Sequence, residues 1–111
     1  MILARNYIET GFSADDAGKL DVIIKPLFDK REQIVIDFEG IKIFTTLFFN
    51  TALAKYVMEI GPDEYEELFE LKNLSEVGEV TYQHSLDNAK NYYVMTEEQR
   101  KKQDEILADP E

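Results

Sequence analysis

The sequence contains no cysteine, which excludes disulfides, thiolate catalysis and sulfur-ligated metal sites together. Histidine is nearly absent as well: His84 is the only one, and a lone histidine on a helix is expected at the surface rather than in a zinc site. No glycine-rich phosphate loop and no serine–histidine–aspartate arrangement can be read from the residues. These absences predict a non-enzymatic protein with no catalytic residues, no metal and no cofactor.

Basic residues are also scarce, with 12 Lys and Arg against 23 Asp and Glu and a formal net charge of -11. Binding to nucleic-acid phosphate or anionic lipid relies on Lys and Arg, so both kinds of contact are disfavoured. Residues 1–55 carry 7 basic and 8 acidic groups, whereas residues 56–111 carry 5 and 15. The acidic surface is therefore expected on the second half of the chain.

Long apolar runs are missing too, since none reaches the roughly 18 to 20 residues of a membrane span, and the start MILARNYIETG lacks the apolar region of a signal peptide. A soluble, cytoplasmic protein is predicted. The 111 residues, 44% of them hydrophobic, suit one compact domain. We assign residues 1–95 to this domain and residues 96–111 to a charged tail or helix extension.

The first half of the chain predicts a strand, a helix and a second strand. Residues 1–9 read as an extended segment or edge strand, and Ser13 is a helix cap followed by acidic residues and an amphipathic apolar pattern. Pro26 lies inside that pattern, so a kink or a tighter final turn is expected there. The β-branched run in Gln33–Phe38 predicts a central strand with parallel neighbours, buried on both faces.

The second half repeats the alternation of helix and strand. A turn at Glu39-Gly40 leads to a helix that begins at Thr45-Thr46 and stops at Gly61-Pro62. A short acidic helical turn follows over 62–67, then a strand that ends at Asn73, and then a helix that begins at Ser75. The order β, α, β, α, β, α predicts an α/β fold with a small mixed or mostly parallel sheet packed by helices.

The stretch VIDFEGIKIFTTLFFNTALAKYV resembles the centre of STAS-type domains, the fold named for sulfate transporters and anti-sigma factor antagonists. In those domains a strand is followed by an Asp-Ser-Ser-Gly turn and an apolar helix. With "DFEG" after the strand and a hydroxyl pair, the stretch is more similar to a STAS-like group of uncharacterised bacterial and phage proteins. The resemblance covers roughly Phe12 to Tyr93, and it implies a regulatory protein–protein interaction module.

The hydroxyl pair Thr45-Thr46 has two interpretations. In the first, Thr46 caps the helix by accepting a backbone hydrogen bond. In the second, which the resemblance implies, Thr46 corresponds to the phosphorylated Ser of the anti-sigma antagonists and Thr45 to the Ser before it. Phe44 stands where those regulators carry Asp, and Leu47 where they carry Gly. From the correspondence with the Ser pair, the phosphorylation hypothesis names Thr46 as the first candidate phosphoacceptor and Thr45 as the second. The candidate partner-binding residues are Asp37, Glu39, Phe44, Leu47 and Asn50.

Asp37 and Glu39 are interpreted as solvated acids at a strand end rather than as a catalytic pair. The resemblance implies a histidine-kinase-type ATPase as partner, because STAS antagonists pair with such kinases. A homodimer is left open, because the aromatic set of Phe44, Phe48, Phe49 and Tyr56 exceeds what one helix face needs.

An alternative function rests on the acidic run between helix and strand, which has six carboxylates and no basic residue. Most such runs are solvated faces. In the alternative interpretation, the run imitates a nucleic-acid phosphate path and blocks a basic groove in a nucleic-acid-binding protein, as small acidic phage inhibitors do. The residues of this acidic surface are Glu59, Asp63, Glu64, Glu66, Glu67 and Glu70.

Overall fold

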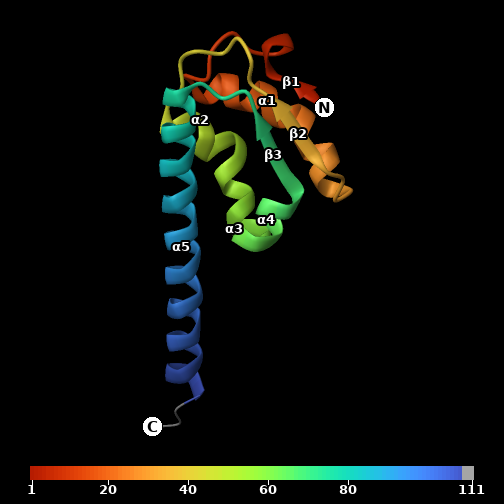
Figure 1. Ribbon diagram of the computed structural model, residues 1–111. Coiled ribbons are helices and arrows are strands. Elements are labelled where there is room, and N and C mark those ends of the chain that lie inside the picture. Colours follow the sequence, from red (N-terminus) through yellow and green to blue (C-terminus); the bar gives the residue numbers. More distant parts are fainter. Residues whose placement is uncertain (109–111) are drawn as a thin grey trace.

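The computed structural model describes the backbone of residues 1–108 and the side chains of residues 1–95. Within this part of the chain one parallel sheet has the strand order β1, β2, β3 (Figure 1). The strands are β1 (Ile2–Leu3), β2 (Ile34–Asp37) and β3 (Phe69–Lys72). β2 is the central strand, as predicted, and the α/β fold class is confirmed. The extended segment predicted over residues 1–9 is an edge strand only at Ile2–Leu3, because Ala4–Asn6 form a 3-10 helix.

The two faces of the sheet differ in burial. Ile34 and Ile36 of β2 are fully buried on one face, against the helices. On the opposite face the half-buried Val35 pairs with the exposed Glu70 of β3, and the buried Asp37 pairs with the exposed Lys72. The prediction that β2 is buried on both faces is therefore met only in part, because Val35 is half-buried although Asp37 on the same face is buried. A short run of β-branched residues indicates a central strand, but it does not reveal how many helical layers cover it.

The first helix, α1 (Ala14–Asp29), begins as predicted. The Ser13 side chain accepts a hydrogen bond from the Asp16 amide at 3.1 Å, which satisfies one of the free N–H groups at the helix start. Pro26 lies in the last turn, where the Arg31 amide donates to the Phe28 carbonyl three residues back. This is the predicted tighter final turn.

The segment Thr46–Ile60 is helical throughout but not uniform. It consists of α2 (Thr46–Phe49), a π-helical turn η2 (Asn50–Ala54) and α3 (Lys55–Ile60). The predicted stop is confirmed, because Gly61 has a φ of 87°, a conformation that glycine adopts readily. The apolar pattern of the sequence indicated an ordinary helix and gave no sign of the π turn, which adds one residue to a turn.

The last elements are α4 (Pro62–Leu68), β3 and α5 (Glu76–Ala108), and α5 extends far beyond the rest of the chain (Figure 1). The predicted cap is confirmed, because Ser75 Oγ accepts a hydrogen bond from the Gly78 amide at 3.1 Å. At 1.5 Å per residue, α5 is about 50 Å long. It crosses the predicted boundary at residue 96 without a break, so the proposed tail begins as helix. The side chains of 96–111 lie outside the described part.

The aromatic residues Phe44, Phe48, Phe49 and Tyr56 are all buried in the core of this single chain. Phe49, for example, stacks on Phe44 with ring centroids 5.3 Å apart and also contacts Phe38 of the segment after β2. These rings are accounted for by the packing of sheet and helices. They therefore offer no dimer interface, and the homodimer stays a prediction without that support.

Candidate functional site

Thr45 is the residue that caps the helix at the candidate site. Its hydroxyl accepts a hydrogen bond from the Phe48 amide at 3.2 Å and donates one to the Phe12 carbonyl at 2.7 Å. Its amide donates to the Gly11 carbonyl at 2.9 Å. Thr45 thus joins the start of α2 to the segment before α1. The prediction that Thr46 is the cap is wrong by one residue, because the extended Thr45 precedes the first helical residue.

Thr46 is the first residue of α2, and its side chain is half-buried. Among the residues that the structure describes, no hydrogen bond to its hydroxyl is found. Thr46 lines a shallow hollow of about 430 Å³ together with Thr81 and His84 of α5. Phe44, Thr45 and Val80 complete the lining. Of the two hydroxyls in the pair, the one without a hydrogen bond in the described part of the chain is therefore that of Thr46, and the exposed His84 lines the same hollow.

Asp37 is not the solvated acid that the sequence suggested, because it is only 7% exposed. Its carboxylate accepts hydrogen bonds from the Glu39 amide at 2.8 Å and from the Asn73 side chain at 3.1 Å. The Glu39 amide, and then Asn73, hold the pKa of the Asp37 carboxyl below its usual value. Asp37 therefore fixes the turn after β2. Glu39 is exposed and lies 3.8 Å from Arg5 in a surface ion pair.

The other candidate partner-binding residues divide into buried and exposed ones. Phe44 is 8% exposed and belongs to the core, so its side chain is not available to a partner. Leu47 is 54% exposed. Asn50 is exposed too, although its side-chain oxygen accepts a hydrogen bond from the buried Ser85 of α5. Leu47 and Asn50 are three residues apart, so they lie on one face of the helical segment.

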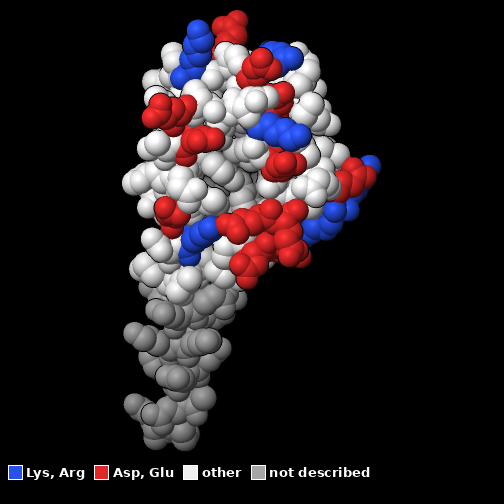
Figure 2. All heavy atoms as spheres, in the orientation of Figure 1, with Lys and Arg blue, Asp and Glu red and all other residues white. Residues whose placement is uncertain are grey.

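The six carboxylates of the acidic run are all exposed. Figure 2 shows acidic side chains gathered over α4, at the far end of the helical segment from Thr46. Glu66 forms an ion pair with Lys90 of α5, and no ion pair of the other five is found in the described part of the chain. The structure therefore separates the acidic surface from the Thr46 hollow.

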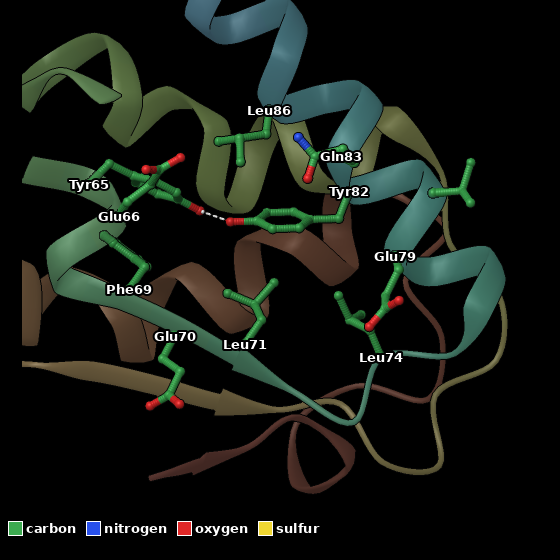
Figure 3. A pocket seen from close by; sticks show the side chains of 11 residues that line it. Tyr65, Glu66, Phe69, Glu70, Leu71, Leu74, Glu79, Tyr82, Gln83 and Leu86 are labelled. Atoms are coloured by element: carbon green, nitrogen blue, oxygen red, sulfur yellow. Dashed lines mark hydrogen bonds between the residues drawn. The ribbon is translucent and has the colours of Figure 1, made fainter. Parts of the chain in front are cut away.

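A larger hollow of about 600 Å³, which the sequence did not reveal, lies between α4, β3 and α5 (Figure 3). The hydroxyls of Tyr65 and Tyr82 are 2.7 Å apart on its wall and share a hydrogen bond. Burial raises the pKa of Tyr82 to about 12 and raises that of Tyr65 as well. The alternation of apolar and polar residues over Phe69, Glu70 and Leu71 indicated a strand with one apolar face. Only the tertiary fold brings α5 beside that strand and so forms the hollow.

The described residues include no cluster of three or more His, Cys, Asp or Glu side chains that would hold a metal ion. Across the same part of the chain, no helix has the length and apolar character needed to cross a membrane.

The parallel sheet, its helical layer and the hydroxyl pair at the start of α2 define an α/β domain of the STAS-like type. The family model described as "STAS-like domain of unknown function (DUF4325)" matches residues 20–79. The chain belongs to this family, which confirms the predicted resemblance. STAS-like domains are generally non-catalytic. No curated protein and no solved structure matches the chain.

Proposed function

We propose that the protein is a non-enzymatic regulatory module that binds a protein partner through the surface around Thr45, Thr46, Leu47 and Asn50, and that phosphorylation of Thr46 switches this binding. The observation that carries the proposal is the difference between the two threonines. The Thr45 hydroxyl is engaged in both a donated and an accepted hydrogen bond, whereas no hydrogen bond of the Thr46 hydroxyl is found among residues 1–95 and Thr46 lines a hollow.

The switch is an electrostatic one. A kinase transfers the γ-phosphoryl group of ATP to the Thr46 Oγ1 and releases ADP and a proton. The product carries about -1.5 to -2 charges at neutral pH, next to an exposed apolar side chain, Leu47, and an exposed amide, Asn50. A partner that packs on this face would meet a desolvated charge after modification. We further propose a histidine-kinase-type ATPase as both kinase and partner, acting in the cytoplasm, as the resemblance to anti-sigma factor antagonists implies.

The test is capture of the partner from cells of the native host by the wild-type chain and by Thr46→Glu, with mass spectrometry to identify the partner and any phosphate on Thr46. A glutamate in the first turn suits the positive end of a helix, so the variant is expected to fold. Partner recovery should fall by at least about tenfold. Asn91→Glu, which adds one charge at an exposed position of α5, is the matched control and should not change recovery.

Equal recovery with Thr46→Glu and wild type would refute the switch. A phosphate found on a residue other than Thr46 would refute the assignment of the acceptor.

A second function, an inhibitor that imitates nucleic acid, is supported by the exposure of all six carboxylates around α4. In that case the triple variant Glu64→Gln, Glu66→Gln, Glu67→Gln would abolish partner capture and Thr46→Glu would not. Binding would also weaken steeply between low and moderate ionic strength, because the contact would be made by exposed charges.

A further inference from the structure

One edge of the sheet is free in the described part of the chain. β3 pairs with β2 on one side, where the Lys72 carbonyl accepts a hydrogen bond from the Phe38 amide at 2.9 Å. Backbone groups alternate in direction along a strand. The amide and carbonyl of Leu71 and the carbonyl of Phe69 therefore point away from β2. The Phe69 amide is already taken, because it donates to the Tyr65 carbonyl of α4.

The free edge borders the 600 Å³ hollow, and α5 stands across from it (Figure 3). The apolar part of the lining consists of Phe69, Leu71, Leu74, Val80 and Leu86. Tyr65 and Tyr82 satisfy each other's hydroxyls, so this wall presents aromatic carbon rather than free donors. A strand laid along β3 would direct every second side chain into this apolar space.

The remaining side chains of an added strand would lie on the other face of the sheet, beside Glu70. Residues on neighbouring strands that face the same way interact directly, and Glu70 is exposed with no ion pair among the described residues. Glu79 of α5 adds a second exposed carboxylate to the lining, also without an ion pair there. Lys72 is exposed on the same face of β3 as Glu70 but does not line the hollow, whereas three carboxylates (Glu66, Glu70 and Glu79) line it without any Lys or Arg. The charge of this lining favours basic side chains next to Glu70, alternating with the apolar ones.

We infer that the edge of β3 binds an extended segment of a partner protein in which apolar residues alternate with Lys or Arg, added as a fourth strand. Main-chain hydrogen bonds to Leu71 and Phe69 provide the attachment, and the hollow and the acidic residues provide the selectivity. This surface goes beyond the proposed switch. It is separated from the Thr46 hollow by the first turns of α5, where only Val80 lines both.

The probe is a fluorescent peptide of alternating Lys and Val, blocked at both ends, titrated into the full chain at low salt. Leu71→Pro removes the outward amide without removing a bond to β2, a position where an edge strand tolerates proline. Leu71→Ala is its matched control, since it trims the side chain and keeps the amide. A peptide with Glu in place of Lys, and one methylated at alternate backbone nitrogens, test charge and hydrogen bonding separately.

Saturable binding of the basic peptide is expected, with Leu71→Pro about fivefold to tenfold weaker than Leu71→Ala, the effect of one hydrogen bond. The double variant Glu70→Gln, Glu79→Gln should weaken binding about threefold or more, whereas Glu32→Gln, Glu59→Gln should not. Thr46→Glu should leave binding unchanged, so this test and that of the switch fail independently.

Three results would overturn the inference. The first is that binding of the basic peptide does not saturate by about 1 mM, since a dissociation constant above about 1 mM is too weak to define a site. The second is equal binding of the basic, acidic and methylated peptides. The third is a dimer in sedimentation that Leu71→Pro dissociates, because the edge would then belong to a second copy of the chain.

Discussion

Two hollows flank the first turns of α5, and they differ in how they are built. The Thr46 hollow is shallow, and its distinguishing group is one free hydroxyl at a helix start. The hollow beside β3 is larger and mostly lined by apolar side chains, and its distinguishing groups are backbone atoms on the outer edge of β3, which no strand of the described residues covers. A single modification can change the first, whereas the second depends on the sheet stopping at three strands. The proposed phosphorylation switch fits the Thr46 hollow, and the proposed binding of an extended partner segment fits the hollow beside β3.

The two hollows share a structural support, and removing it should give the largest effect. Phe49 is fully buried, stacks on Phe44 of the Thr46 hollow, and contacts Tyr82 of the β3 hollow with ring centroids 5.2 Å apart. Phe49→Ala should lower the free energy of unfolding by about 3 to 5 kcal/mol, as measured by urea denaturation. Phe12→Ala, at a 60% exposed position, should change it little. Similar losses for both variants would contradict the assigned core.

Gly78 tests the close packing between the hollows. A Cβ at this position would lie 2.8 Å from the Phe44 ring and 3.1 Å from Leu74. Phe44 lines the Thr46 hollow and Leu74 lines the β3 hollow. Gly78→Ala should therefore destabilise the fold by about 1 to 3 kcal/mol through overpacking, despite the better helix propensity of alanine. Gly18→Ala in α1 is the matched variant, since nothing lies within 4 Å of its Cβ. It should stabilise the chain by about 0.5 to 1 kcal/mol in the same urea experiment.

The contrast between the two threonines can be measured directly. Thr45→Ala removes the helix cap and the bond to Phe12, so it should lower stability by about 1 to 2 kcal/mol. Thr46→Ala removes a hydroxyl for which no bond is found in the described part, and it should cost less than about 0.5 kcal/mol. Thermal unfolding of both variants checks the difference. If Thr46→Ala proved the more damaging, the cap would have been assigned to the wrong residue.

The last contrast concerns the tyrosine pair of the β3 hollow. Tyr82→Phe leaves the Tyr65 hydroxyl without its partner and should cost about 1 kcal/mol. In the wild type the pKa of Tyr82 is raised to about 12 from 10.0, so the folded state holds its proton longer than the unfolded state. The stability that this provides is present below pH 10 and is lost as the pH rises toward 12. Unfolding measured across this range should show a shallower decline in Tyr82→Phe.

The sequence predicted the elements well where the signal is local. Ser13 and Ser75 cap their helices through side chains that bond an amide three residues away, and Gly61 ends α3 with a positive φ. Such features depend on neighbouring residues alone. At the candidate site the hydroxyl pair was found, but the helix cap lies one residue earlier than predicted, at Thr45. The further bond from Thr45 to Phe12, which joins positions 33 apart, could not be predicted from a local pattern.

Features that depend on distant segments could not be predicted. The buried Asp37 accepts one of its hydrogen bonds from Asn73, which follows the next strand. The aromatic residues that suggested a dimer are all buried in the core of one chain. The open face of the sheet and the hollow at β3 arise because the helices cover one face and α5 stands away from the strand edge. The packing of distant segments determines such spaces, and a local sequence pattern does not specify that packing.

The sequence by itself determined the class of fold, the family, the acidic character and the position of the hydroxyl pair. The fold class, the acidic character and the position of the hydroxyl pair follow from composition, periodicity and short-range capping. The family follows from the resemblance of one stretch of sequence and from the family model that matches residues 20–79. Only the tertiary structure decided which threonine is free, which acids and aromatics are buried, and where the sheet leaves an edge open. Each of these depends on contacts between segments far apart in the chain, and such contacts form only when the whole domain packs.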